Sequence, residues 1–392
     1  MCRARFATLV VACVTEIRPR PNLGPEFHSV LVLPAIDRAA NRQRGARRWM
    51  PLLWAADQFK AAQAEYREDG GTAFGAPPAS GRRRDVAYFR DALTGWDEAA
   101  ADEAISSLHQ YASPREIFDA LWRFGLRDYR DIGHKSIYLA GARRLIDRIA
   151  WRSALPVLRS LTLAVLRREQ PVDAEMDAAW PIVDEFARAL PAAPPRDTAL
   201  EPNLELLQIL RGGTEDDARR AASGLWRAGD SAPAWGAIVV GAAEIHARNP
   251  GSLVALHAVT TANALRVIST TADDRDRTRR IALLHAVGRI VWFRGYAAEV
   301  ARKAKPKPEH CAALAEPIER ATLADPTSLL AATHDAIVDR ASESHDYKFA
   351  EAVAEDAAAL PDRWRGRYLA AAICRMSLAQ PNDRNRWIRA LV

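Results

Sequence analysis

Helix-forming residues dominate the apolar positions of this chain, and that pattern restricts its fold more than any other feature. The apolar residues are mainly Ala and Leu, with few of the Val, Ile and Thr alternations that are typical of strands. No series of strand-like segments is separated by turn residues. Because 49% of the residues are apolar, the chain can bury a sizeable core. We therefore predict an all-α protein.

One helix start is encoded around residue 113. Ser113 is a favourable N-cap, Pro114 suits the first helical position, and Glu116 can complete a capping box. We expect this helix to end near Gly125. Further helices are expected over residues 49–66, 97–109, 133–150, 155–168, 175–189, 199–211, 215–227, 233–247, 252–269, 276–295, 308–322, 326–340, 346–359 and 362–378. They show no fixed repeat period, so a solenoid is not favoured.

The sequence predicts one domain boundary. Residues 70–84 combine Gly, Pro and three Arg, which disfavours both helix and strand and indicates a linker. We expect residues 1–84 to form a peripheral N-terminal segment, poorly ordered over residues 15–45 because these are rich in Pro and Arg. Residues 85–392 are expected to form a single large multi-helix domain.

Charge and cysteine content restrict the classes of partner. The formal net charge is +6, but Arg is mixed with Asp and Glu rather than collected into one block, so nucleic acid is not implied. The four cysteines have no C-x-x-C spacing, which indicates neither a thiolate zinc site nor a disulfide framework. They are Cys2, Cys13, Cys311 and Cys374. A reducing, cytoplasmic setting fits this pattern.

The N-terminus was compared with export signals. Residues 10–13 resemble a lipoprotein cleavage box, but the apolar run over residues 6–14 is short for a signal peptide and Arg-Pro-Arg-Pro follows it at residues 18–21. We therefore favour a cytoplasmic location. No later stretch approaches the ~18 to 20 uninterrupted apolar residues of a membrane span, so no membrane partner is expected.

Four segments carry histidines inside or beside apolar, helix-like stretches. Neutral imidazole is a common ligand for Zn, Fe, Cu and Ni, so convergence of these segments would create a metal site. The segments begin at His109, at Asp131 (with His134), at His257 and at His345. Of the other histidines, His285 fits a core position, whereas surface or capping positions are expected for His28, His246, His310 and His334.

Two of these segments contain further candidate residues. Tyr138 lies one helical turn after His134, so the two rings can share one space, and Asp131 can fix the tautomer of the imidazole. An Asp-capped helix with a buried histidine explains the same residues equally well. His257, Thr260 and Asn263 form a polar stripe in an apolar helix, which is costly unless these groups are satisfied.

The last segment pairs a histidine with a lysine. His345 and Lys348 are three residues apart and share a helix face, with Tyr347 between them in sequence. In a dry pocket the charged form of a lysine is disfavoured, and a neutral amine can capture carbon dioxide as a carbamate, an anionic oxygen ligand. The alternative is an ordinary helix-surface lysine.

The order of these segments resembles the questin oxidase-like family, helical proteins that include fungal enzymes oxygenating anthraquinone rings. The resemblance covers residues 85–380 and implies a non-haem Fe(II) held by four histidines and a carboxylated lysine. The ligands it implies here are His109, His134, His257, His345 and Lys348. It also implies a small aromatic, quinone-like substrate, dioxygen, and a redox partner such as a Rieske protein. Residues 1–84 do not match the family.

The resemblance predicts an oxidoreductase, an oxygenase, whose pocket would include Tyr138, Thr260, Asn263 and Tyr347. Two alternatives remain open. The doublets at His334 and at His345-Asp346 resemble His-Asp metal-dependent phosphohydrolases, in which Asp346 would be a ligand. A helical interaction scaffold would bind no metal.

Overall fold

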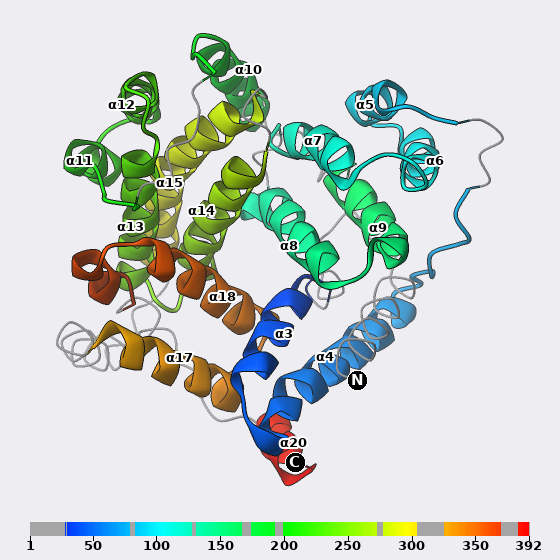
Figure 1. The fold of residues 1–392 in the computed structure, drawn as a ribbon. Coiled ribbons are helices and arrows are strands. Elements are labelled where there is room, and N and C mark those ends of the chain that lie inside the picture. The colour runs from blue at the N-terminus through cyan, green and yellow to red at the C-terminus, as the bar shows by residue number, and fades with distance from the viewer. Residues whose placement is uncertain are drawn as a thin grey trace. The chain divides into compact units, whose positions relative to one another are not determined.

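The computed structural model describes residues 28, 30–78, 83–127, 131–166, 174–192, 199–272, 277–303, 325–369 and 383–391. These residues form helices and loops and contain no strand, which confirms the predicted all-α fold (Figure 1). The chain divides into two compact units. Unit 1 comprises Met1–Trp180 with Ile388–Val392, and unit 2 comprises Pro181–Trp387.

Unit 1 packs its helices around an apolar core. Its helices are α3 (Leu33–Arg42), α4 (Trp49–Glu68), α5 (Val86–Thr94), α6 (Glu98–Leu108), α7 (Pro114–Gly125), α8 (His134–Arg148) and α9 (Leu155–Leu166). Helix α9 packs against α6 and α8, and α3 packs against α4 and α8. Short 3-10 turns at Gly45–Arg48, Asp131–Gly133 and Trp151–Ser153 connect them.

Unit 2 is built around α14. Its helices are α11 (Leu204–Gly212), α12 (Glu215–Arg227), α13 (Ala232–Arg248), α14 (Leu253–Thr271), α15 (Thr278–Lys303), α17 (Pro326–Arg340) and α18 (Ser344–Ala359). Helix α14 contacts α13, α15 and α18. The division between the units falls inside α10 (Ala174–Arg188), and α20 (Asp383–Leu391) also spans a division.

Local signals account for many helix ends. Ser113 Oγ accepts from the Glu116 amide, and Glu116 Oε2 accepts from the Ser113 amide at 2.9 Å, which confirms the predicted capping box of α7. The same motif recurs at α12, where Thr214 pairs with Asp217. Arg294 caps the last turn of α11 by donating to the carbonyls of Leu210 and Gly213, both at 2.8 Å.

The segment before residue 85 contains more structure than the sequence indicated. Helix α3 lies within the stretch expected to be poorly ordered, with Pro34 in its first turn and Ile36, Ala39 and Ala40 buried on one face. That face packs within unit 1. Several expectations fall outside the described residues: the four cysteines, the N-terminal apolar run, His310 and the helix over residues 308–322.

Helix α14 is long and apolar enough to cross a membrane by length and composition, with a mean hydropathy of 1.2 in its best window. No such stretch was expected from the sequence. Because 72% of that window is buried inside the structure, α14 also has the character of a core helix.

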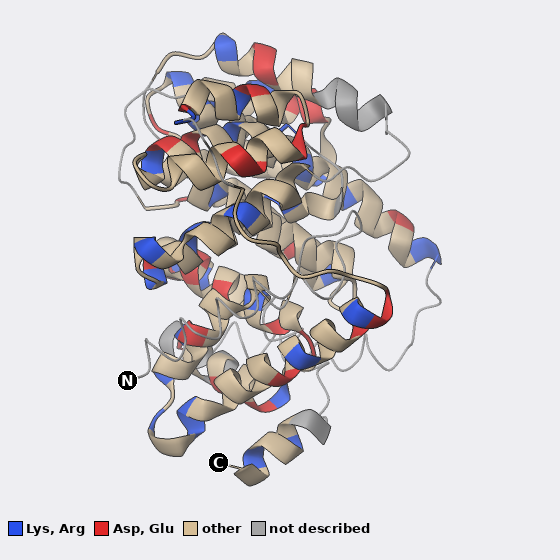
Figure 2. Cartoon of the chain, turned by 90° about the vertical axis from the view of Figure 1, so that its right-hand side faces the viewer, with Lys and Arg blue, Asp and Glu red and all other residues tan. Residues whose placement is uncertain are grey.

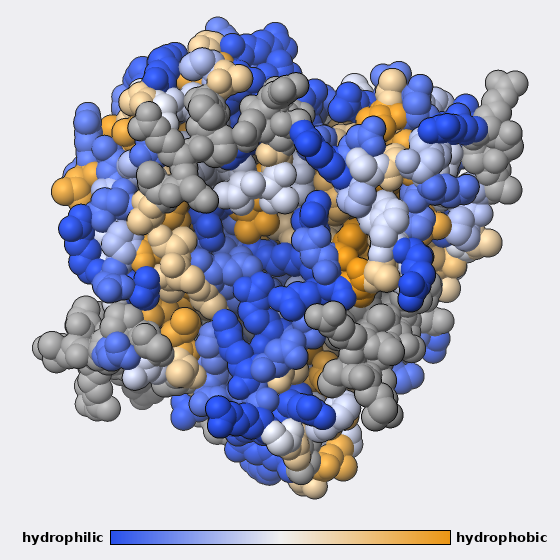
Figure 3. Space-filling view, viewed as in Figure 1, coloured by the Kyte–Doolittle hydropathy of each residue, from blue (hydrophilic) through white to orange (hydrophobic). Residues whose placement is uncertain are grey.

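Charges of both signs are spread along the helices, as Figure 2 shows. On the face seen in Figure 3, hydrophilic residues cover much of the described surface and hydrophobic residues form separate groups. This mixing matches the sequence, in which Arg is interspersed with Asp and Glu.

Candidate metal centre

Two histidines meet inside unit 2. His257 lies on α14 and His345 is the second residue of α18, and their ring centroids are 5.1 Å apart with the planes at 67°. The helices run in the same direction, since Asn263 further along α14 reaches Ala352 and Asp356 further along α18. His257 is 2% exposed and the His345 side chain 12%. The structure thus brings two of the predicted ligands together.

The hydrogen bonds of these two rings define which nitrogen can bind a metal. His257 Nδ1 donates to the Leu253 carbonyl at 2.7 Å, and His345 Nδ1 donates to Glu343 Oε2 at 3.1 Å. Both partners are acceptors, so each neutral ring carries its proton on Nδ1 and its lone pair on Nε2. Metal-binding histidines usually have this arrangement, in which a carbonyl or carboxylate orients the ring.

Lys348 adds a third candidate ligand one turn beyond His345. It is 8% exposed, so the alternative of a helix-surface lysine is wrong. Burial lowers the pKa of Lys348 from 10.5 to about 7, and the charge of Glu343 opposes part of this shift. A substantial fraction of the side chain is therefore a neutral amine near pH 7, the form that reacts with carbon dioxide.

Asp346 caps the helix that carries these residues. Its Oδ2 accepts from the Ser342 amide at 2.9 Å, from Ser342 Oγ at 3.2 Å and from the Glu343 amide at 3.3 Å. These bonds satisfy donors at the start of α18. The phosphohydrolase alternative needs the Asp346 carboxylate as a metal ligand. In the structure its Oδ2 caps α18 instead.

A second pair of histidines meets inside unit 1. His134 is the first residue of α8, and its ring lies 5.3 Å from that of His28, with the planes at 70°. Their ligand nitrogens lie within 4.8 Å, and both residues are buried. Tyr138 stacks on His134 with centroids 5.8 Å apart, as its spacing on the helix predicted. This buried pair of histidines offers two candidate ligand nitrogens for a metal ion.

The backbone before His134 is strained. Ile132 and Gly133 both have positive φ, 45° and 87°. The left-handed region suits glycine but is costly for a β-branched residue, and such strain is often found at functional sites. These residues direct the chain into α8 and so determine the position of His134, the first residue of that helix. The side chain of Asp131, the expected tautomer-fixing group, lies outside the described part of the chain.

His109 has a different environment. It ends α6, and its Nε2 donates to the Trp151 carbonyl at 2.8 Å while Trp151 Nε1 donates to the His109 carbonyl at 3.3 Å. These bonds join α6 to the turn at Trp151–Ser153. Among the described residues, no group of three or more potential metal ligands includes His109.

The sequence reasoning missed His28 and misplaced His246. Both were expected on the surface or at caps, but His28 is 8% exposed and His246 is fully buried, with its ring centroid 4.6 Å from that of Phe349. The signal for His28 was its position directly before the apolar residues 30–33, which the surrounding Pro and Arg obscured. His285 is buried, as expected, and His334 is half-buried.

The predicted pocket residues divide into two groups. Tyr138 and Tyr347 are buried beside the histidines in their own helices, and Thr260 donates weakly to the Leu256 and His257 carbonyls, both at 3.5 Å. Asn263 instead joins a buried network, because its Nδ2 donates to Asp356 Oδ1 at 3.0 Å. The polar stripe of α14 is therefore satisfied in two ways, Asn263 by this network and His257 and Thr260 by carbonyls of α14 itself.

Asp356 is the centre of that network. It also accepts from Arg266 at 2.8 Å and from the Tyr368 hydroxyl at 3.0 Å, and burial raises its pKa despite the arginine. Asp356→Ala leaves these donors without their acceptor, so we expect it to lower the free energy of unfolding by about 3 to 5 kcal/mol. Urea denaturation measures this. Asp362→Ala, a control at an exposed ion pair, should change stability by less than about 0.5 kcal/mol.

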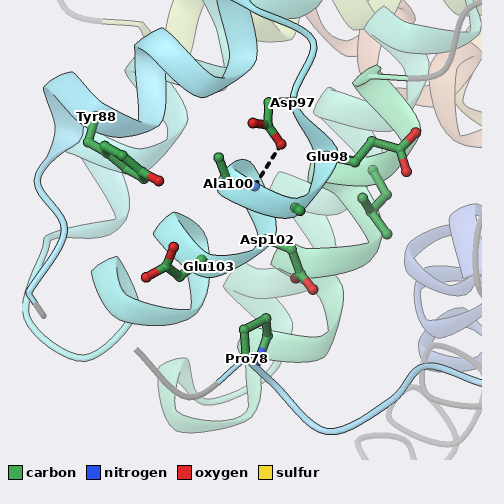
Figure 4. A pocket seen from close by; sticks show the side chains of 9 residues that line it. Pro78, Tyr88, Asp97, Glu98, Ala100, Asp102 and Glu103 are labelled. Atoms are coloured by element: carbon green, nitrogen blue, oxygen red, sulfur yellow. Dashed lines mark hydrogen bonds between the residues drawn. The ribbon is translucent and has the colours of Figure 1, made fainter. Parts of the chain in front are cut away.

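Unit 1 also contains an open, acidic pocket of about 680 Å³ (Figure 4). Three of its four carboxylates already have structural roles. Asp97 caps α6, Asp102 forms two bonds with Arg159 at 2.7 and 2.8 Å, and Glu103 pairs with Arg84 at 3.0 Å. These pairings explain the cluster without a bound ligand.

Comparisons with known proteins identify no relative of this chain: no family model, no curated protein and no solved structure matches it.

Proposed function

We propose that this protein is a metal-dependent oxidoreductase, an iron-dependent oxygenase acting on a small aromatic substrate. The observation that carries the proposal is the meeting of His257 and His345, each with Nδ1 bonded to an acceptor, next to the buried Lys348. Imidazole nitrogens with one anionic oxygen form a ligand set that suits iron(II). The resemblance of the histidine segments to the questin oxidase-like family supports the same chemistry.

Lys348 would supply the anionic oxygen. Its neutral amine attacks carbon dioxide, a nitrogen–carbon bond forms, and one proton leaves, so that the product is a carbamate with one negative charge. The depressed pKa of Lys348 provides the neutral amine near pH 7. Burial disfavours an unpaired charge, so the carbamate would be stable in these buried surroundings only beside a cation, which iron(II) would supply.

Within unit 1, the buried pair of His134 and His28 is a separate candidate for metal binding. The resemblance also proposes His109, whose Nε2 already donates to the Trp151 carbonyl. When bound, iron(II) would supply electrons and an open coordination position for dioxygen. In unit 2, Tyr347 on α18 would orient the substrate by ring contacts. Electrons for turnover would come from a phenolic substrate or from a Rieske-type protein partner.

Metal content tests this proposal. We expect protein reconstituted anaerobically with iron(II) to retain iron after desalting, and His257→Ala and His345→Ala to retain about tenfold less. The matched control is His334→Ala, on α17 and in neither histidine pair, which should retain the wild-type amount. If the wild-type protein is fully folded but retains no iron, the proposal is wrong and the alternative of a metal-free helical scaffold remains. The metal content of His134→Ala reports separately whether the unit 1 pair holds a metal ion.

A further inference from the structure

We propose that Glu343 is a positioning residue that holds the imidazole of His345 in the orientation and tautomer required for metal binding. This inference rests on the proposed metal-binding function. The contact that carries it is the 3.1 Å bond from His345 Nδ1 to Glu343 Oε2. A carboxylate at this position fixes the proton on Nδ1 and raises the basicity of Nε2.

The local backbone explains how Glu343 reaches the ring. Glu343 is the N-cap residue of α18 and has an extended conformation, with φ −143° and ψ 167°. Its side chain therefore contacts a residue in the first turn, only two positions ahead. Capping is shared with Asp346, which accepts from the Ser342 and Glu343 amides. The Glu343 side chain also accepts from the Asp346 backbone amide in the capping box, and its Oε2 accepts from His345 Nδ1 at 3.1 Å.

The two ligand histidines of unit 2 differ in their supporting group. His257 donates to a backbone carbonyl of its own helix, which no side-chain substitution removes. His345 donates to a carboxylate whose side chain is 43% exposed. At this exposure the solvent screens the long-range field of Glu343, so its effect comes mainly from the hydrogen bond. His345 is therefore the ligand whose strength one substitution can change.

The test is a titration of the full-length, metal-free protein with cobalt(II), followed by visible absorption. Glu343→Ala should weaken cobalt(II) binding by about 10- to 100-fold. Glu343→Gln should retain most of the affinity, because the amide oxygen still accepts from Nδ1. Ser342→Ala is the control for capping, since it removes one bond to Asp346 without touching His345, and it should bind cobalt(II) like the wild type.

The outcomes separate this inference from the proposed function. If wild-type protein binds no cobalt(II), the metal-binding proposal itself fails. If it binds and Glu343→Ala binds equally well, the positioning role of Glu343 is wrong. Thermal unfolding of the metal-free variants completes the test: equal losses of stability and of affinity in Glu343→Ala and Ser342→Ala would reduce Glu343 to a helix cap and overturn the inference.

Discussion

Replacing Lys348 with alanine is expected to remove the bound iron and, with it, dioxygen consumption. The variant loses the amine that would form the anionic oxygen ligand, so iron content should fall by about tenfold or more. Added bicarbonate or a short carboxylate such as acetate should partly restore both iron and activity, because either supplies the missing oxygen donor. Iron analysis and oxygen-electrode measurements on the desalted protein provide the readout.

Asp346→Asn is the matched comparison for Lys348→Ala. Asp346 caps α18 through Ser342 and Glu343, so this variant should lose some stability but keep most of its iron. The phosphohydrolase alternative requires the opposite order, with iron lost in Asp346→Asn and retained in Lys348→Ala. That result would overturn the assignment of Lys348 as a ligand.

The sequence predicted those features of the fold that depend on local interactions. The capping box of Ser113 and the stacking of Tyr138 on His134 both follow from spacings of three or four residues, which a helix determines directly. Helix α3 escaped prediction because its Pro and Arg content resembled that of a disordered segment, although Pro34 is favourable in a first turn.

The candidate site was harder to predict, because it depends on contacts between distant segments. The meeting of His257 and His345 requires α14 and α18 to pack in one particular register, which no local pattern encodes. The resemblance supplied that pair, and it gave no reason to select His28. The burial of Lys348 likewise follows from packing, since its spacing alone is equally compatible with an exposed helix face.

The domain organisation also depends on tertiary contacts. The sequence placed a boundary at residue 84 on the basis of Gly, Pro and Arg content, whereas the contacts divide the chain between Trp180 and Pro181. This position lies inside α10, where Pro181 is compatible with a continuing helix. Gly, Pro and charge content predicts exposed loops, but a boundary between units that falls inside a helix has no such composition and cannot be predicted from it.

The burial of Lys348 should make stability depend on pH in a specific direction. The native pKa is about 7 and the ordinary value is 10.5. Between these values the unfolded chain binds a proton that the native state does not. The free energy of unfolding is therefore highest above pH 10.5 and decreases as the pH falls to about 7. The loss is about 1.4 kcal/mol per pH unit for one group.

Lys348→Met removes this titration and should therefore be more stable than the wild type, by the largest amount below about pH 7, with the difference vanishing near pH 10.5. Urea denaturation in metal-free, carbon dioxide-free buffer at several pH values measures the difference. Lys303→Met, at a side chain that is 75% exposed, should show no such trend. A difference between Lys348→Met and wild type that stays constant with pH would mean that Lys348 titrates normally, and the neutral amine required for the carbamate would then be scarce at pH 7.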